Sequence, residues 1–199
     1  MDENKVLFSH YFFQRAYELC VECLQETYPT ELGTTAANDF CAHAIDVYIF
    51  SVAALEAFIN ETLLSEFYIP GSTGGVPWRV FRNTFEDLGI KEKYYLLPLF
   101  LFGKTYDKGR QPYQDFTTLV KIRNTLIHHK EKSVEQKFQV ASLSSAERSR
   151  WAYNTACRMV FKLLEFGSSE LSDSRLWAKS ELRLITKDSW EGIPRTHIK

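Results

Sequence analysis

Apolar residues recur every three or four positions along most of this chain, a pattern typical of amphipathic helices. The predicted helices span residues 4–28, 36–68, 78–88, 91–102, 113–130 and 144–167, the third of them being short. Stretches rich in Gly, Pro and Thr separate several of them and predict loops. Because little of the chain alternates as a strand does, we expect an all-α protein, a bundle of four to five helices with a short irregular C-terminal tail.

Three local signals refine this expectation. Pro98 should bend the helix of residues 91–102 or end it early, because proline removes a helical N–H donor. Gly167 should cap the last long helix at its C-terminus. Residues 174–188 fit either a short helix or a strand. We therefore expect a bundle domain over residues 1–167 and a C-terminal appendage over 168–199 that packs on it.

Charge and hydropathy exclude some classes of protein. With 24 basic and 25 acidic residues the net charge is −1, so the chain does not coat nucleic acid through bulk charge, although a local basic patch remains possible. The longest apolar run, residues 94–102, is too short to span a bilayer, and Pro98 interrupts it. The N-terminus is acidic and then amphipathic, unlike a signal peptide. We expect a soluble, cytoplasmic protein without a membrane partner.

The cysteines point to structure more than to chemistry. Cys20 and Cys23 have the spacing of a redox or zinc pair, but they lie inside an apolar, helix-periodic stretch. A metal site would need a distant partner such as Cys41 or His43. We expect buried thiols and no metal. A hydrolase using Cys20 or Cys157 with a histidine is a remote alternative, since neither cysteine has a recognisable nucleophile context.

Two charged residues fall on apolar helix faces. On a helical wheel, Arg123 lies inside the apolar arc of residues 113–130, and Glu56 lies inside the arc of the helix over 36–68. An unpaired charge in a core costs several kcal/mol of folding free energy, so such groups normally have partners. We expect Glu56 and Arg123 to meet across the two helices or to line one polar cleft. A purely structural ion pair is the competing interpretation.

The residues that follow Arg123 favour phosphate chemistry. Asn124 and His128 share one flank of the helix, and His129 lies on the other. The basic residues nearby, which would contact RNA, are Lys121, Lys130 and Lys132. An arginine offers a planar fork of donors to phosphate, and a histidine can move a proton near neutral pH. No cluster of carboxylates suggests a magnesium site.

The stretch "RNTLIHH", residues 123–129, resembles the motif of HEPN domains, a superfamily of helical nucleotide-binding and ribonuclease domains. That motif is an Arg, usually followed by a polar residue such as Asn, and then a His, with four to six positions between the Arg and the His. Arg123, Asn124 and His128 match it, and His129 fits the longer spacing. Residues 46–63, with Glu56, resemble the long helix that precedes the motif in many members. The resemblance covers roughly residues 5–167.

This resemblance implies a metal-independent and cofactor-independent endoribonuclease, such as a toxin or a phage-defence effector. An RNA 2′-hydroxyl would attack the adjacent phosphate and leave a 2′,3′-cyclic phosphate and a 5′-hydroxyl. The implied catalytic residues are Arg123 for the charged phosphate, His128 as acid or base (His129 as the alternative), Asn124 for positioning and Glu56 for orienting Arg123. The resemblance also implies a homodimer with the site at its interface, and an antitoxin or defence-system partner. A catalytically inactive module for dimerisation, nucleotide binding or partner-protein binding is the second hypothesis.

The helix over residues 36–68 carries apolar side chains on several faces, which bears on assembly. Those outside the arc of Glu56 are Val47, Phe50, Ala54, Ala57, Phe58 and Leu64. A helix that is apolar nearly all round needs cover on more than one side. Self-association would supply it, with a twofold axis using one patch twice. The alternative is that the tail folds back over the helix through Leu176, Trp177 and Leu182.

Overall fold

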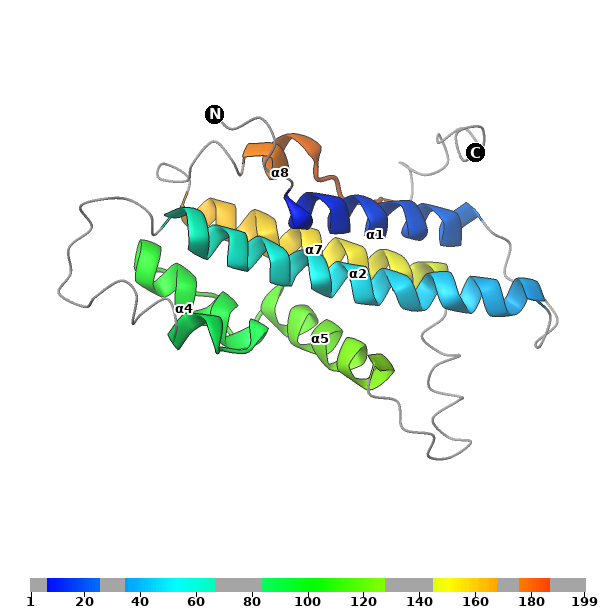
Figure 1. Cartoon of the computed structure of the whole chain (residues 1–199), viewed down its shortest axis with the longest axis horizontal. Coiled ribbons are helices and arrows are strands. Elements are labelled where there is room, and N and C mark those ends of the chain that lie inside the picture. The colour runs from blue at the N-terminus through cyan, green and yellow to red at the C-terminus, as the bar shows by residue number, and fades with distance from the viewer. Residues whose placement is uncertain (1–6, 26–34, 67–83, 128–144, 168–175, 187–199) are drawn as a thin grey trace.

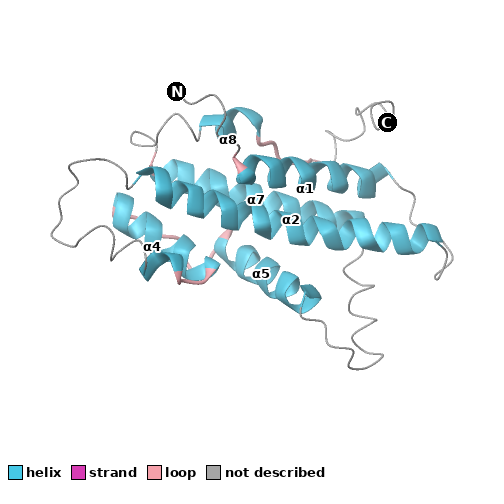
Figure 2. Cartoon of the chain, in the orientation of Figure 1, coloured by secondary structure: helices cyan, strands magenta, loops and turns pink. Residues whose placement is uncertain are grey.

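A computed structural model describes residues 7–25, 35–66, 84–127, 145–167 and 176–186 of the chain. Its main helices are α1 (Phe8–Gln25), α2 (Thr35–Glu66), α4 (Ile90–Phe102), α5 (Tyr113–Ile127), α7 (Ala146–Phe166) and α8 (Leu176–Glu181). No strand occurs within these ranges, and the described chain is almost entirely helical (Figure 2). The expected all-α bundle is confirmed.

Helix α2 is the centre of the bundle. It packs against α1 and α7 along one side and against α4 and α5 on another. The three long helices α1, α2 and α7 run side by side, with α8 beside α1 and with α4 and α5 on the opposite side of the bundle (Figure 1). Buried residues cover more than half of the circumference of α2, which leaves one narrow polar arc on it.

Buried tyrosines join α4 and α5 to the long helices. The hydroxyl of Tyr94 donates to the carbonyl of Leu55 at 3.0 Å, and that of Tyr106 donates to the carbonyl of Met159 at 2.6 Å. The Tyr94 ring also packs on Phe116 of α5, with 5.1 Å between ring centroids. Because both hydroxyls are satisfied, the rings bury their full apolar area without an unpaired polar atom. These contacts fix where α5 leaves the core.

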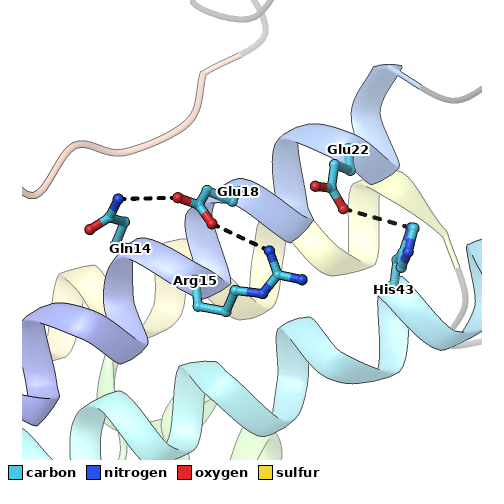
Figure 3. A network of polar contacts seen from close by, with 5 residues as sticks. All are labelled: Gln14, Arg15, Glu18, Glu22 and His43. Atoms are coloured by element: carbon cyan, nitrogen blue, oxygen red, sulfur yellow. Dashed lines mark hydrogen bonds and ion pairs between the residues drawn. The ribbon is translucent and has the colours of Figure 1, made fainter. Parts of the chain in front are cut away.

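Polar contacts hold α1 against α2 at two levels. The backbone N–H and the hydroxyl of Ser9, at the start of α1, both donate to the carboxylate of Glu61 on α2. A carboxylate at a helix N-terminus satisfies orphan N–H donors and complements the helix dipole. About three and a half turns further along α1, Glu22 faces His43 of α2 at 3.8 Å (Figure 3). The two helices are thereby fixed in register.

The helix bounds agree with the sequence prediction where both are described. Helix α7 ends at Phe166 with Gly167 as its C-cap, as predicted, and the Gly167 N–H donates to the carbonyl of Leu163. In the region 174–188, the described residues 176–186 contain a helix and no strand. Of the short helix expected over 78–88, the structure describes a helical turn at 84–86.

Pro98 does not end its helix. Helix α4 continues through Pro98 to Phe102 and stops at Gly103, which has φ 63° and donates its N–H to the carbonyl of Leu99. Of the two predicted effects of Pro98, a bend or an early end, the early end is excluded. The ring of Pro98 is buried in the bundle, so packing offsets the one hydrogen bond that it removes.

Residues Ala42–Thr62 of α2 are long and apolar enough to cross a membrane by length and composition alone. Half of that segment is buried inside the bundle. It also carries Glu56 and Glu61, which form polar contacts with α5 and α1. A central bundle helix accounts for this apolar composition, because its side chains pack against helices of the same chain.

The described part of the C-terminal region folds back onto the bundle. Ala178, Leu182 and Ile185 are buried, and Trp177 lies against Phe58 of α2 with ring centroids 6.2 Å apart. Asn154 of α7 receives the backbone N–H of Ile185 at 2.8 Å and donates to its carbonyl at 2.9 Å. Tail residues therefore cover part of the apolar surface of α2, as the alternative to self-association required.

Candidate functional site

Arg123 of α5 contacts Glu56 of α2, as the sequence predicted. The guanidinium Nη2 lies 3.3 Å from the Glu56 Oε2, across 67 positions of sequence. The buried residues Phe116, Leu119 and Val120 hold the first half of α5 in the core. Arg123 follows on the same side of the helix, where α5 begins to leave the bundle.

The pair is only partly buried. The Arg123 side chain is 19% exposed, but that of Glu56 is 48% exposed. The prediction that Glu56 lies within the apolar arc of α2 was therefore wrong: it stands at the margin of that arc. The reason is that α1, α7 and α8 cover the far side of α2, so the boundary of the buried arc is set by the packing of the other helices.

Most of the donors of Arg123 remain available. A guanidinium offers five N–H donors in a planar fork. Within the described residues, the carboxylate of Glu56 is its only polar partner, and that contact is a single one through Nη2. Glu56 can thus hold the side chain in place while other N–H groups face a ligand. An anion such as a phosphate group fits that fork bidentately.

The other predicted site residues divide into two groups. Asn124 and Lys121 lie on α5 with exposed side chains. Lys121 precedes Arg123 by two positions, more than half a helical turn, so it points to nearly the opposite side of α5. The remaining predicted residues, His128, His129, Lys130 and Lys132, lie outside the described part of the chain.

Two further residues belong to the same region and were missed in the sequence. Lys93 of α4 is 6% exposed, and its Nζ donates to Oδ1 of Asn60 on α2 at 2.9 Å. Asn60 follows Glu56 by four positions, so both residues face the same side of α2. The polar arc of α2 therefore receives one cation from α5 and another from α4. The sequence does hold a signal, because Lys93 falls on the helical stripe of Ile90, Tyr94 and Leu97.

Three of the four cysteines are buried thiols, as predicted. Cys20, Cys23 and Cys157 are fully buried, whereas the side chain of Cys41 lies outside the described part. Burial raises the pKa of Cys157 to about 12, and burial together with the Cys23 thiol raises that of Cys20. Thiols in this state are poor nucleophiles.

A metal-binding group does not form around these thiols within the described residues. His43, the partner that a zinc site would have required, contacts Glu22 instead (Figure 3). Over the described ranges, no three His, Cys, Asp or Glu side chains gather as a metal site requires.

A pocket of about 460 Å³ lies between α1, α7 and α8, on the far side of the bundle from α5. Aromatic side chains wall it, namely Phe13, Tyr17, Tyr153 and Trp177. Its histidine, His10, contacts Glu181 at 2.7 Å and lies against the Trp177 ring. The residues with a motif for phosphate chemistry lie elsewhere, on α5 and α2, so the pocket is a weaker candidate than the arc of α2.

Comparison of the chain with family models, with curated proteins and with solved structures finds no match. The evidence for a function therefore comes from the motif residues and from the geometry around Arg123.

Proposed function

We propose that this protein is an endoribonuclease of the HEPN type. The observation that carries the proposal is the contact of Arg123 with Glu56 at 3.3 Å. This arginine is braced by a carboxylate from another helix. In the sequence it stands five positions before the histidine of an Arg-Asn-x-x-x-His motif. A structural ion pair would require no such motif beside it.

The chemistry assigned to these residues is the attack of an RNA 2′-hydroxyl on its own 3′-phosphate. The oxygen–phosphorus bond forms as the bond to the 5′-oxygen of the next nucleotide breaks, which leaves a 2′,3′-cyclic phosphate and a 5′-hydroxyl. Arg123 stabilises the charge that develops on the phosphate oxygens. His128 moves the proton as general base or acid, and Asn124 positions the sugar or the phosphate.

Glu56 acts as a positioning residue. Its carboxylate accepts from Nη2 of Arg123 and limits the rotamers of a long, flexible side chain. Preorganised donors contribute more to a transition state than donors that must be ordered during the reaction. The near-neutral net charge of the chain fits a local site better than a broad basic surface.

We assign the active form to a homodimer in the cytoplasm, with two copies of the motif facing one cleft. A toxin or defence role, held in check by an antitoxin or another defence-system partner, fits this activity. Support comes from the resemblance of residues 123–129 and from Ile127, whose side chain is 50% exposed on the side of α5 that carries Arg123. Val47, Ala54 and Phe58 of α2 are buried within the chain and give the dimer no support, whereas the side chain of Leu64 lies outside the described part.

The test is cleavage of transfer RNA and of a structured RNA by the purified protein, with and without EDTA. We expect cleavage that resists EDTA, products ending in 2′,3′-cyclic phosphate, and no cleavage of DNA of the same sequence, since DNA lacks the 2′-hydroxyl. His128→Ala should abolish cleavage without changing the circular dichroism spectrum.

His10→Ala is the matched control, because His10 lies on α1 far from Arg123. Its cleavage rate should equal that of the unmodified protein. If His129→Ala rather than His128→Ala abolishes cleavage, the histidine with the longer spacing is the catalytic one. A protein that cuts none of these RNAs would instead be the inactive module for dimerisation, nucleotide or partner-protein binding.

A further inference from the structure

Lys93 is a buried cation with no anionic partner among the residues that the structure describes. It is 6% exposed, and the side-chain oxygen of Asn60 holds its ammonium group at 2.9 Å. Among the described residues Asn60 is its only polar partner, and Asn60 is neutral. Burying an uncompensated charge costs several kcal/mol, so a lysine in this setting normally has an acidic partner or a bound anion.

The hydrogen bond that holds the ammonium group is only partly buried. Asn60, to which it donates, is only half-buried on the polar arc of α2. Lysine commonly buries its aliphatic stem and presents its charged head in such a setting. An ammonium group has three N–H donors, and the bond to Asn60 uses one. Two donors therefore remain for a ligand that approaches along α2.

The position relative to Arg123 indicates what that ligand is. Arg123 reaches Glu56, and Lys93 reaches Asn60, which lies one helical turn further along α2. Four helical residues rise about 6 Å. Two cations from different helices thus meet one arc of α2 at successive levels, which suits an extended polyanion with regularly spaced charges. A single small anion would use only one of them.

We infer that Lys93, held by Asn60, binds a second phosphate of the RNA strand whose reacting phosphate contacts Arg123. This inference rests on the proposed function for the identity of the strand. It makes Lys93 a substrate-binding residue that discriminates a strand of several nucleotides from a single nucleotide. Free inorganic phosphate can use the same donors at one of the two positions along α2. The experiment distinguishes free phosphate from an RNA strand.

The experiment measures binding of a fluorescent 2′-O-methyl RNA oligonucleotide, which cannot be cleaved because it lacks the nucleophilic hydroxyl. Fluorescence anisotropy gives the affinity at several salt concentrations. Each phosphate contact on a single strand contributes about 0.7 to the slope of log affinity against log salt. Lys93→Met should therefore reduce that slope by about 0.7 and weaken binding at low salt.

Lys179→Met is the matched control, since Lys179 is exposed on α8, on the opposite side of α2 from α4 (Figure 1). It should leave the slope unchanged, and Lys93→Arg should restore the slope by returning the charge. If Lys93→Met binds RNA with the slope of the unmodified protein, the inference is overturned. The inference is also overturned if Lys93→Met binds inorganic phosphate or an acidic peptide more weakly than the unmodified protein does, but binds RNA equally well.

Thermal melting separates a ligand-binding lysine from a structural one. Replacing an uncompensated cation by methionine of similar length should leave the melting temperature equal or higher. A melting temperature well below that of the unmodified protein would show that Lys93 stabilises the fold, and would overturn the inference. The binding assay does not depend on cleavage, because the oligonucleotide cannot be cut. If Lys93→Met reduces the salt slope but the unmodified protein cleaves no RNA, the binding site is retained and the proposed nuclease is rejected.

Discussion

Asn154 of α7 and Ile185, which follows α8, exchange two hydrogen bonds across 31 positions of sequence. The side-chain amide of Asn154 on α7 donates to the carbonyl of Ile185 at 2.9 Å and accepts its N–H at 2.8 Å. The amide thus satisfies both backbone polar groups of one residue outside the helices. Because both partners are buried, this contact attaches the tail to the bundle.

Asn154→Leu should detach this segment. The N–H and carbonyl of Ile185 would remain buried without partners, which costs about 1–3 kcal/mol of unfolding free energy. Urea denaturation should show that loss. Limited proteolysis should cut the chain between α7 and the C-terminus faster than it cuts the unmodified protein. Gln114→Leu, at an exposed position of α5, should change neither measurement. Equal proteolysis of Asn154→Leu and the unmodified protein would contradict this role.

Glu56→Gln should separate activity from stability. The Glu56 carboxylate is 48% exposed, and partly exposed ion pairs contribute roughly 0–1 kcal/mol. A fully buried pair would contribute about 3–5 kcal/mol when broken, and the observed exposure removes that expectation. The melting temperature should fall little, whereas kcat for RNA cleavage should drop tenfold or more, on the order expected for a misplaced catalytic group.

For Glu56→Gln the control is Glu165→Gln, which breaks the exposed contact of Glu165 with Lys162 on α7. Its kcat and KM should equal those of the unmodified protein. A Glu56→Gln variant that loses stability and keeps its kcat would mark the contact of Glu56 with Arg123 as purely structural.

Alkaline pH should destabilise the fold through buried thiols. The pKa of Cys157 is raised from 9.0 to about 12 by burial, and that of Cys20 is raised in the same direction. The unfolded chain therefore releases these protons near pH 9 while the folded chain retains them. The contribution of these thiols to the unfolding free energy should be constant below about pH 9 and fall above it, by up to about 1.4 kcal/mol per thiol and pH unit.

Urea unfolding under reducing conditions at pH 8, 9 and 10 measures this dependence. Cys157→Ala will be less stable at every pH because it creates a cavity. Its unfolding free energy should nevertheless decline less steeply above pH 9. A decline as steep as that of the unmodified chain would assign the alkaline loss to other groups, such as Tyr48, whose burial raises its pKa to about 12.

The sequence predicted which two side chains pair at the site better than it predicted how deeply each is buried. The wheel placed Arg123 on the apolar stripe of α5 correctly, because that stripe depends only on local periodicity. It misplaced Glu56, because α2 is apolar nearly all round and only the packing of α1, α4, α5 and α7 decides which arc stays open. Lys93 was missed although it obeys the same periodicity, since its significance appears only when Asn60 is found beside it.

The assembly prediction now depends on the end of α5. Ile127 lies four positions after Arg123, on the same side of the helix, and its side chain is 50% exposed. The large side chains before it on that stripe, such as Leu119, are buried in the bundle. A second copy of the chain that covers Ile127 would bring two Arg123 side chains toward one cleft. Light scattering should then report about twice the chain mass of 23.2 kDa at micromolar concentration.

Ile127→Glu tests whether this surface is the interface. A charge at a desolvated dimer contact should shift the protein to a monomer and remove RNA cleavage, while the helical content stays the same. Tyr11→Glu places the same charge on an exposed aromatic of α1 and should leave both the dimer and cleavage intact. A monomer for the unmodified chain would reject the dimer outright. A dimeric Ile127→Glu that still cuts RNA would place the interface elsewhere, and the site of Arg123 would then function within one chain.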